Sequence, residues 1–138
     1  MVLFLREDAR MLSSVIVVHR ENHRVERRAG TVVVTIWKRP DLSREEGANL
    51  AVLLKGTVME EAARSNATRL VLDLTDAHPA WGPKTHEALV TMVGAWRGKS
   101  IVVVAPEAIT RMGLQQVCKS ARVTARFVSS VREVERQE

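Results

Sequence analysis

The sequence contains a single cysteine, Cys118, so no disulfide can form within the chain. One thiolate also excludes a structural zinc site built mainly from cysteine. There is no tyrosine, and three tryptophans and two phenylalanines are the only large aromatic residues. Such low cysteine usage is typical of a reducing compartment, so we expect the protein in the cytoplasm, with Cys118 as a small buried apolar side chain.

Long apolar runs are also missing. No segment is long enough to cross a bilayer as a helix. The opening residues, "MVLFLREDAR", have too short an apolar run for a signal peptide, and charges follow at once. We therefore expect no membrane span, an N-terminal extension over residues 1–12, and a single domain over residues 13–138.

Positive charge is present but not concentrated. The formal net charge is +5, from 21 Lys and Arg against 16 Asp and Glu. The densest basic cluster, "HRENHRVERRAG", is mixed with acids and has no interleaved aromatic residue on which a base could stack. We expect no specific nucleic-acid partner, and at most weak binding that salt suppresses.

The dominant pattern is an alternation of short apolar strands with amphipathic helices. It predicts strands near residues 14–20, 23–30, 31–37, 69–74, 100–105 and 123–129. Helices are expected from the capping box Ser43/Glu46, from Pro83, from Pro106, and briefly after residue 129. The order predicts an α/β fold, a single mixed and mostly parallel sheet of roughly four to six strands with three or four helices.

Each of the first three expected helices carries an apolar stripe that we assign to the core. The three stripes are Leu50, Ala51, Leu54, Val58, Met59 and Ala62; then Leu89, Met92, Val93 and Trp96; then Ile109, Met112 and Val117.

The stretch "DLTDAHPAWGPKTHEAL" follows the fourth strand and leads into a helix. Sites in α/β folds tend to form where a strand ends in this way. Pro79 and Pro83 restrict the residues before them and stiffen the loop. Trp81 is either a packing plug over the sheet edge or an interface anchor. The candidate partner-binding residues are Asp76, His78, Trp81, Gly82, Lys84, Thr85 and His86.

Two chemical readings of the same loop are weaker. A histidine oriented by a carboxylate can act as a general base, but the loop offers no evident nucleophile. Asp73 and Asp76 are better explained as acceptors for turn backbone groups. The spacings of His78 with His86, and of His19 with His23, match no known ligand motif, so we expect no metal and no cofactor.

Three segments carry a family resemblance: "GTVVVTIWKRPDLSREEGANLAVLL", "RLVLDLTDAHPAWGPKTHEALVTMV" and "GKSIVVVAPEAITRMGLQQV". Their order and apolar pattern resemble a STAS domain, the module of anti-sigma-factor antagonists and of the cytoplasmic part of sulfate transporters. The resemblance covers about residues 25–130 and implies a protein-interaction role. The looser STAS/SEC14-type set is similar too, and would imply binding of a small ligand or lipid.

One departure from the family bears on regulation. Phosphorylatable STAS domains have an Asp-Ser-Ser-Gly type motif where this chain has Trp81, Gly82, Pro83 and Lys84. Neither serine is present, so the resemblance leaves no phosphoacceptor at the family position. Thr85 is the nearest hydroxyl and the one candidate phosphoacceptor, because a helix N-terminus favours a phosphate. The simpler reading is that Thr85 caps the helix or faces solvent.

The leading hypothesis is therefore a non-enzymatic protein-interaction or regulatory module of STAS-like fold that lacks the usual phosphoacceptor serine. Its partner is expected to be another protein, and a homodimer is an open alternative. Two rival hypotheses are a module that binds a small ligand or lipid, and an enzyme that uses the loop histidines.

Overall fold

A six-stranded sheet forms the centre of the molecule, and each strand lies beside its neighbour in sequence. The computed structural model describes residues 14–64 and 66–136, so the predicted extension over residues 1–12 lies outside the described residues. Strands β1 to β3 pair antiparallel, and β3 to β6 pair parallel. The strands are β1 (Val15–His19), β2 (His23–Arg28), β3 (Thr31–Trp37), β4 (Arg69–Asp76), β5 (Ser100–Val104) and β6 (Arg126–Val128).

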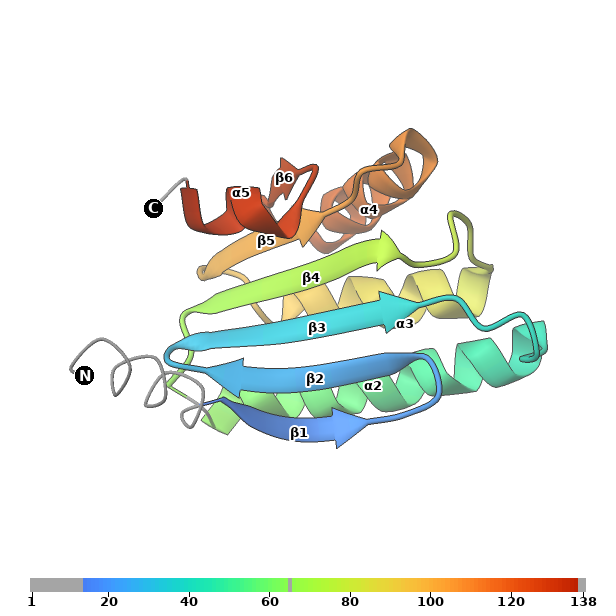
Figure 1. Ribbon diagram of the computed structural model, residues 1–138, viewed down its shortest axis with the longest axis horizontal. Coiled ribbons are helices and arrows are strands. Elements are labelled where there is room, and N and C mark those ends of the chain that lie inside the picture. The colour runs from blue at the N-terminus through green and yellow to red at the C-terminus, as the bar shows by residue number, and fades with distance from the viewer. Residues whose placement is uncertain (1–13, 65, 137–138) are drawn as a thin grey trace, which may run out of the picture.

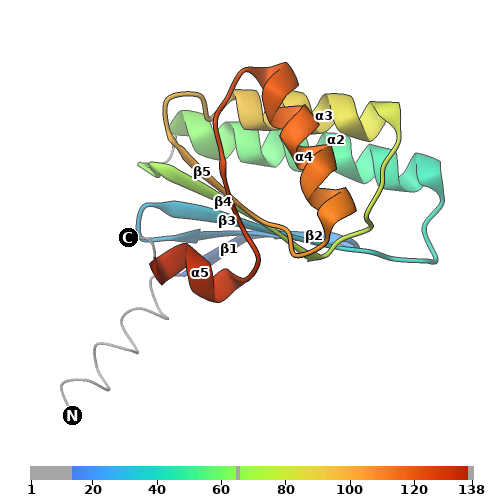
Figure 2. The same ribbon diagram turned by 90° about the horizontal axis from the view of Figure 1, so that it is seen from above.

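Three helices cover one face of this sheet, and a fourth, short helix lies on the other face (Figures 1 and 2). The helices are α2 (Arg44–Arg64), α3 (Pro83–Gly94), α4 (Ala108–Ala121) and α5 (Val131–Arg136). Each of α2, α3 and α4 connects one parallel strand to the next. The predicted α/β fold, with its mixed and mostly parallel sheet, is confirmed.

The helix starts follow the local sequence. Ser43 Oγ accepts a hydrogen bond from Glu46 N at 3.0 Å, and Ser43 N donates to Glu46 Oε1 at 2.8 Å, so the predicted capping box is confirmed. Pro83 is the first residue of α3, where its missing N–H costs nothing. This helix ends at Gly94, earlier than expected, and Gly98 instead supplies a positive φ of 88° in the turn that follows.

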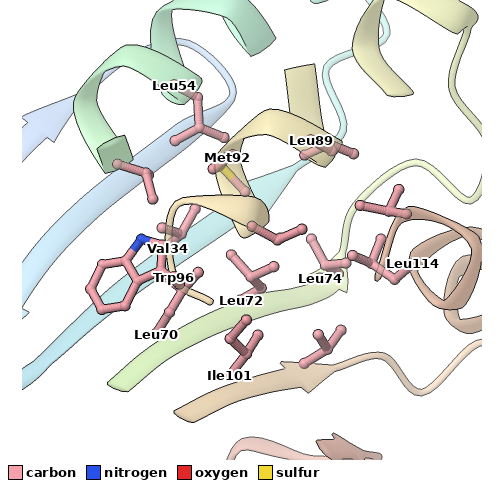
Figure 3. Packing of buried hydrophobic residues seen from close by; sticks show 14 of the residues in the cluster. Val34, Leu54, Leu70, Leu72, Leu74, Leu89, Met92, Trp96, Ile101 and Leu114 are labelled. Carbon is pink, nitrogen blue, oxygen red and sulfur yellow. The ribbon is translucent and has the colours of Figure 1, made fainter. Parts of the chain in front are cut away.

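The main core fills the space between the sheet and the helix layer (Figure 3). Leu89, Met92 and Val93 are buried on α3 as predicted, and Trp96 is buried in the turn that follows this helix. On α2, Leu50, Leu54 and Val58 are buried and Ala51 and Ala62 half-buried, but Met59 is 38% exposed. The prediction was wrong for Met59 because one residue beyond Val58 lies about 100° further round the helix.

The stripe predicted for α4 was wrong in its direction. Ile109 and Met112 are 63% and 64% exposed, whereas Val117 is buried as expected. The buried row of α4 instead consists of Thr110, Leu114, Val117, Cys118 and Ala121. These positions recur every three or four residues, so they share one helix face. Thr110 is buried on that face, whereas Ile109 and Met112 lie outside it.

A smaller core lies on the opposite face of the sheet, beneath α5. Val134 of α5 packs with Val71, Val102, Val104 and Val128 from the three last strands. Strands β4 and β5 are therefore apolar on both faces, as the continuous runs "RLVLDL" and "SIVVVA" indicated. Within the described residues, no helix is both long enough and apolar enough to cross a membrane.

Candidate functional site

The candidate site lies at the edge of the sheet where β3, β4 and β5 end and the chain turns into α2, α3 and α4 (Figure 1). Asp76 is the last residue of β4 rather than a loop residue, because this strand is longer than predicted. Its carbonyl oxygen accepts a hydrogen bond from Lys38 N at 3.0 Å. The connection between β3 and α2 is therefore tied to the start of the loop that contains the other candidate residues.

Trp81 lies against α4. A Cβ atom added to Gly113 would be only 2.7 Å from Cη2 of the Trp81 ring, so a larger residue at position 113 would displace the indole. Trp81 is half-buried and packs against the main core. The structure therefore confirms the packing role that the sequence allowed, and it adds a contact across 32 positions of sequence, since 113 − 81 = 32.

The helix that Trp81 contacts also carries two exposed apolar residues. Ile109 lies one turn before Gly113 on the same side of α4, and Met112 directly precedes Gly113. We call Trp81, Ile109 and Met112 the α4 patch. Single exposed apolar side chains are ordinary, whereas several beside a rigid loop are typical of an interaction surface. Sequence reasoning missed Ile109 and Met112 because it assigned both to the core.

Several candidate side chains hold the loop itself in place. His78 Nδ1 lies 2.8 Å from the Ala80 carbonyl oxygen and 3.2 Å from Ala80 N, so either protonation state of that nitrogen makes a bond within the loop. Asp73 Oδ1 accepts from Thr75 N at 3.1 Å and from Thr75 Oγ1 at 2.6 Å. Asp73 therefore satisfies a backbone group as expected, but that group lies within β4 and not in a turn.

The start of α3 presents the remaining candidate residues. Gly82 is its N-cap and provides no side-chain hydrogen bond, and no acid lies in the first turn. Lys84 Nζ donates to Asn49 Oδ1 of α2 at 3.1 Å, while Thr85 and His86 are half-buried. The amide groups at this helix end and the Lys84 charge make the local potential positive.

The geometry bears on the chemical readings of the loop. Among residues 14–64 and 66–136, no three His, Cys, Asp or Glu side chains cluster as metal ligands would. A hydroxyl nucleophile would need to donate its proton to a histidine. The Thr75 hydroxyl on β4 donates to Asp73 instead. The structure therefore gives His78 and Asp73 local structural roles and gives Trp81 a packing role against α4.

A different set of polar groups lies at the opposite end of the helix layer. Lys99 Nζ donates to the carbonyl oxygens of Ala62 and Ala67, both at 3.1 Å, and lies 4.9 Å from the centre of the Trp96 ring. Ala62 belongs to the last turn of α2. The ammonium group therefore neutralises carbonyl groups at a helix C-terminus, where the partial charge is negative.

Arg97 has the same role for α4. Its Nη2 donates to the carbonyl oxygen of Ala121, the last residue of that helix, at 2.5 Å. Arg122 then ends α4 with a left-handed φ of 58°. A pocket of about 300 Å³ lies between these basic residues, and Ile101 and Val123 contribute to its walls. Because the helix C-termini already engage Arg97 and Lys99, we assign these charges to the fold rather than to an anionic ligand.

The sequence reasoning did not foresee that His23, Glu26, Glu61 and Thr110 are buried, and the first of the two discussed below is Glu61. This residue of α2 is 1% exposed and accepts two hydrogen bonds from Arg27, from Nε at 2.7 Å and from Nη2 at 2.9 Å. These hydrogen bonds lower the pKa of Glu61 below its usual value. The bidentate pair joins α2 to β2.

The second buried polar group is His23, the first residue of β2 and only 1% exposed. Its Nδ1 lies 2.7 Å from Asn22 Oδ1, and within the described chain its Nε2 has no hydrogen-bond partner. Burial, followed by the charge of Arg20, lowers the pKa of His23 to about 4. The sequence did contain a signal for the burial of His23, because His23, Val25 and Arg27 alternate along the strand and so share one face of the sheet.

Comparison with solved structures supports the fold. The structure resembles the NMR structure of the protein TM1081 with a TM-score of 0.55 and 14% sequence identity, over 87% of this chain and 93% of that one. At that identity the likeness concerns the fold alone. No protein-family model matches the sequence, and no curated protein matches it either.

Proposed function

We propose that this protein is a non-enzymatic interaction or regulatory module of STAS-like fold, whose partner is another protein that binds the α4 patch and the start of α3. The observation that carries the proposal is the position of Ile109 and Met112. Both are more than 60% exposed, and both lie on the helix that Trp81 contacts at Gly113, Ile109 one turn before that glycine and Met112 directly before it. Apolar side chains on a rigid support lose little conformational entropy when a partner covers them.

The surroundings of the patch favour this role. Arg111 donates to the carbonyl oxygens of Ala105 and Pro106, which fixes the connection between β5 and α4. His78 fixes the neighbouring loop from within. A preformed surface of this kind suits recognition of a folded partner.

The charges indicate the chemistry of the partner surface. The start of α3 has no acid in its first turn, and it carries Lys84, whose Nζ donates to Asn49 of α2. We therefore expect the partner to combine an apolar anchor with a nearby carboxylate. Such complementarity contributes mainly to specificity and association rate.

The experiment is capture of partners from extracts of the host cell with matched charge variants. Ile109→Lys places a charge within the patch, while Val131→Lys changes a residue of similar exposure, 54%, on α5 at the other face of the sheet. Both substitutions alter solvent-facing positions, so both variants should keep the fold.

We expect one protein that is captured by the wild type and by Val131→Lys and is lost with Ile109→Lys. Its affinity for Ile109→Lys should be weaker by at least about 2 kcal/mol, the usual threshold for an interface hot spot. Equal capture by the three forms, or no capture by any of them, would contradict the proposal.

The proposal also includes the loss of the family's phosphoryl switch. Pro83 occupies the position of a serine, and Thr85 is half-buried in the first turn of α3. Intact-mass spectrometry of protein purified from its host should show no stoichiometric phosphate. Stoichiometric phosphate on Thr85 would contradict the loss of the phosphoryl switch. The interaction role is tested separately, by the capture of partners.

A further inference from the structure

Strand β1 forms one edge of the described sheet and is unusually apolar for an exposed edge. Its residues, "VIVVH", include no proline, glycine, lysine or acid. Only β2 pairs with it among the described residues. Soluble proteins normally protect such edges with charges, prolines or a covering element, because the unpaired backbone groups recruit another strand.

Exposed apolar side chains gather along this edge. Val15 is 47% exposed and Ile16 is 59% exposed, and successive strand residues face opposite sides of a sheet. The helix nearest to β1 is α2 (Figure 1), and it carries the exposed residues Val52, Leu53 and Met59. Apolar side chains are therefore exposed both on β1 and on the helix that lies nearest to it.

The opposite edge differs. Strand β6 has three residues, and α5 packs beside it through Val134 and Val128. Arg126 on this strand donates to the Val134 carbonyl oxygen at 3.1 Å. The edge at β6 is thus short and partly covered, whereas that at β1 is longer and lacks comparable cover within the described residues.

We propose that β1 is the interface of a homodimer, in which β1 pairs antiparallel with β1 of a second copy. A two-fold axis normal to the sheet would join the two sheets into one and place both helix layers on the same side. An antiparallel pair separates the two copies of His19 and Arg20, which a parallel pair would bring together. A second copy therefore fits this edge better than a charged partner, because each strand offers the other an uncharged apolar row.

The paired segment is short, which limits the strength of the dimer. The pairing of β1 with β2 shifts register between Ile16 and Val18, so Val17 has no directly opposite residue. Such an irregularity twists the strand and shortens the regular ladder. We therefore expect a dimer that dissociates on dilution, with an interface at the small end of the range for specific complexes.

The test is the molar mass of the full chain in solution as a function of concentration, by light scattering and sedimentation equilibrium. Ile16→Lys is the disrupting variant, because two lysines would lie near the axis. Ile16 is opposite Glu26 on β2, so the lysine has an acidic neighbour in the monomer. Val131→Lys, with an exposed apolar residue changed on α5, is the matched control.

We expect the wild type and Val131→Lys to approach twice the mass of the 15.4 kDa chain at high concentration. Ile16→Lys should raise the dissociation constant at least about tenfold. If circular dichroism shows that Ile16→Lys unfolds, Val15→Lys on the other face provides the same reading.

Two results would overturn the proposal. One is an equal dissociation constant for the wild type and Ile16→Lys. The other is a monomer at every concentration. If the β1 amides of that monomer were protected from hydrogen exchange, residues 1–13 of the same chain and not a second copy would be the partner of β1. Neither result depends on the α4 patch, so the proposed function can fail or stand separately.

Discussion

The two ends of the helix layer differ in how their polar groups are used. At the end formed by the C-termini of the helices, Lys99 and Arg97 donate to carbonyl groups of α2 and α4. At the opposite end, α3 and α4 begin without a side-chain cap, and Ile109 and Met112 are exposed in the first half of α4. At the first end, side chains of the chain itself satisfy two helix C-termini, whereas at the second end Ser43 caps α2 but no side chain caps α3 or α4.

This difference separates residues that serve stability from residues that serve recognition. A basic residue at a helix C-terminus neutralises the partial charge of the carbonyl groups, so a basic cluster there needs no ligand. Exposed apolar side chains such as Ile109 and Met112 contribute little to the fold and are available to a partner. Substitutions at the two ends should therefore have opposite effects on stability and on binding.

The largest expected effect is the pH dependence of folding stability that His23 causes. This side chain lies where β2 begins, beside the end of β3, and so at the recognition end. Its pKa is about 4 in the folded protein against 6.5 when unfolded, because burial disfavours the charged form. The unfolded chain binds the proton first as pH falls, so stability should decrease from pH 6.5 to 4 and level off below, by about 3 kcal/mol in total.

Urea unfolding of the wild type and of His23→Leu at several pH values measures this contribution. Carboxylates titrate in the same window, so the difference between the two proteins is the relevant quantity. If both lose stability equally between pH 6.5 and 4, the histidine is not buried in its neutral form.

The next effect concerns Glu61 near the end formed by the helix C-termini. Glu61→Ala removes the carboxylate that accepts two hydrogen bonds from Arg27. We expect a loss of about 2 kcal/mol, below the value for a fully buried pair because Arg27 can turn towards water. Glu60→Ala, at an exposed position one residue earlier, should cost less than about 0.5 kcal/mol. Equal melting temperatures for the two variants would contradict the assignment.

The fold was largely predictable because its strands are marked by β-branched apolar runs. "TVVVTIW" became β3 with the predicted bounds, and Ser43 with Glu46 marked the start of α2. The error on α4 has a physical cause. Its sequence holds two apolar rows, one through Ile109 and Met112 and one through Leu114 and Val117, and only tertiary packing decides which row faces the sheet.

A smaller loss of stability is expected from a substitution of Lys99, which lies at the end formed by the helix C-termini. Lys99→Met keeps the aliphatic chain but removes the donor to Ala62 and Ala67, and it removes the charge beside Trp96. We expect a loss of about 1–2 kcal/mol, the usual cost of charge-assisted hydrogen bonds. Partner capture should be unchanged. A partner lost with Lys99→Met would mean that this end also takes part in recognition.

The candidate site was only partly predictable for a related reason. The strand-to-helix loop around Trp81 stands out because of its two prolines and its place after β4. The contact of Trp81 with Gly113 joins distant parts of the chain, and no local pattern indicates it. The members of the patch on α4 therefore required the three-dimensional structure.

The smallest expected effect on stability is that of Lys84→Met at the recognition end. Its hydrogen bond with Asn49 joins two exposed side chains, and such bonds contribute less than about 0.5 kcal/mol. Its effect on partner binding should be larger in the association rate, and should decrease with added salt. Stopped-flow mixing at two salt concentrations measures the association rate. A rate that the substitution does not change would show that Lys84 takes no part in the recognition surface.

The most direct test of the central claim is calorimetric titration of the captured partner into Met112→Lys protein whose folded stability has been verified by urea unfolding. Met112 is 64% exposed, so its replacement should leave the free energy of unfolding within about 0.5 kcal/mol of the wild type. We predict that partner binding weakens by at least about 2 kcal/mol. Unchanged binding by the folded variant would contradict the claim that this end of the molecule is its recognition surface.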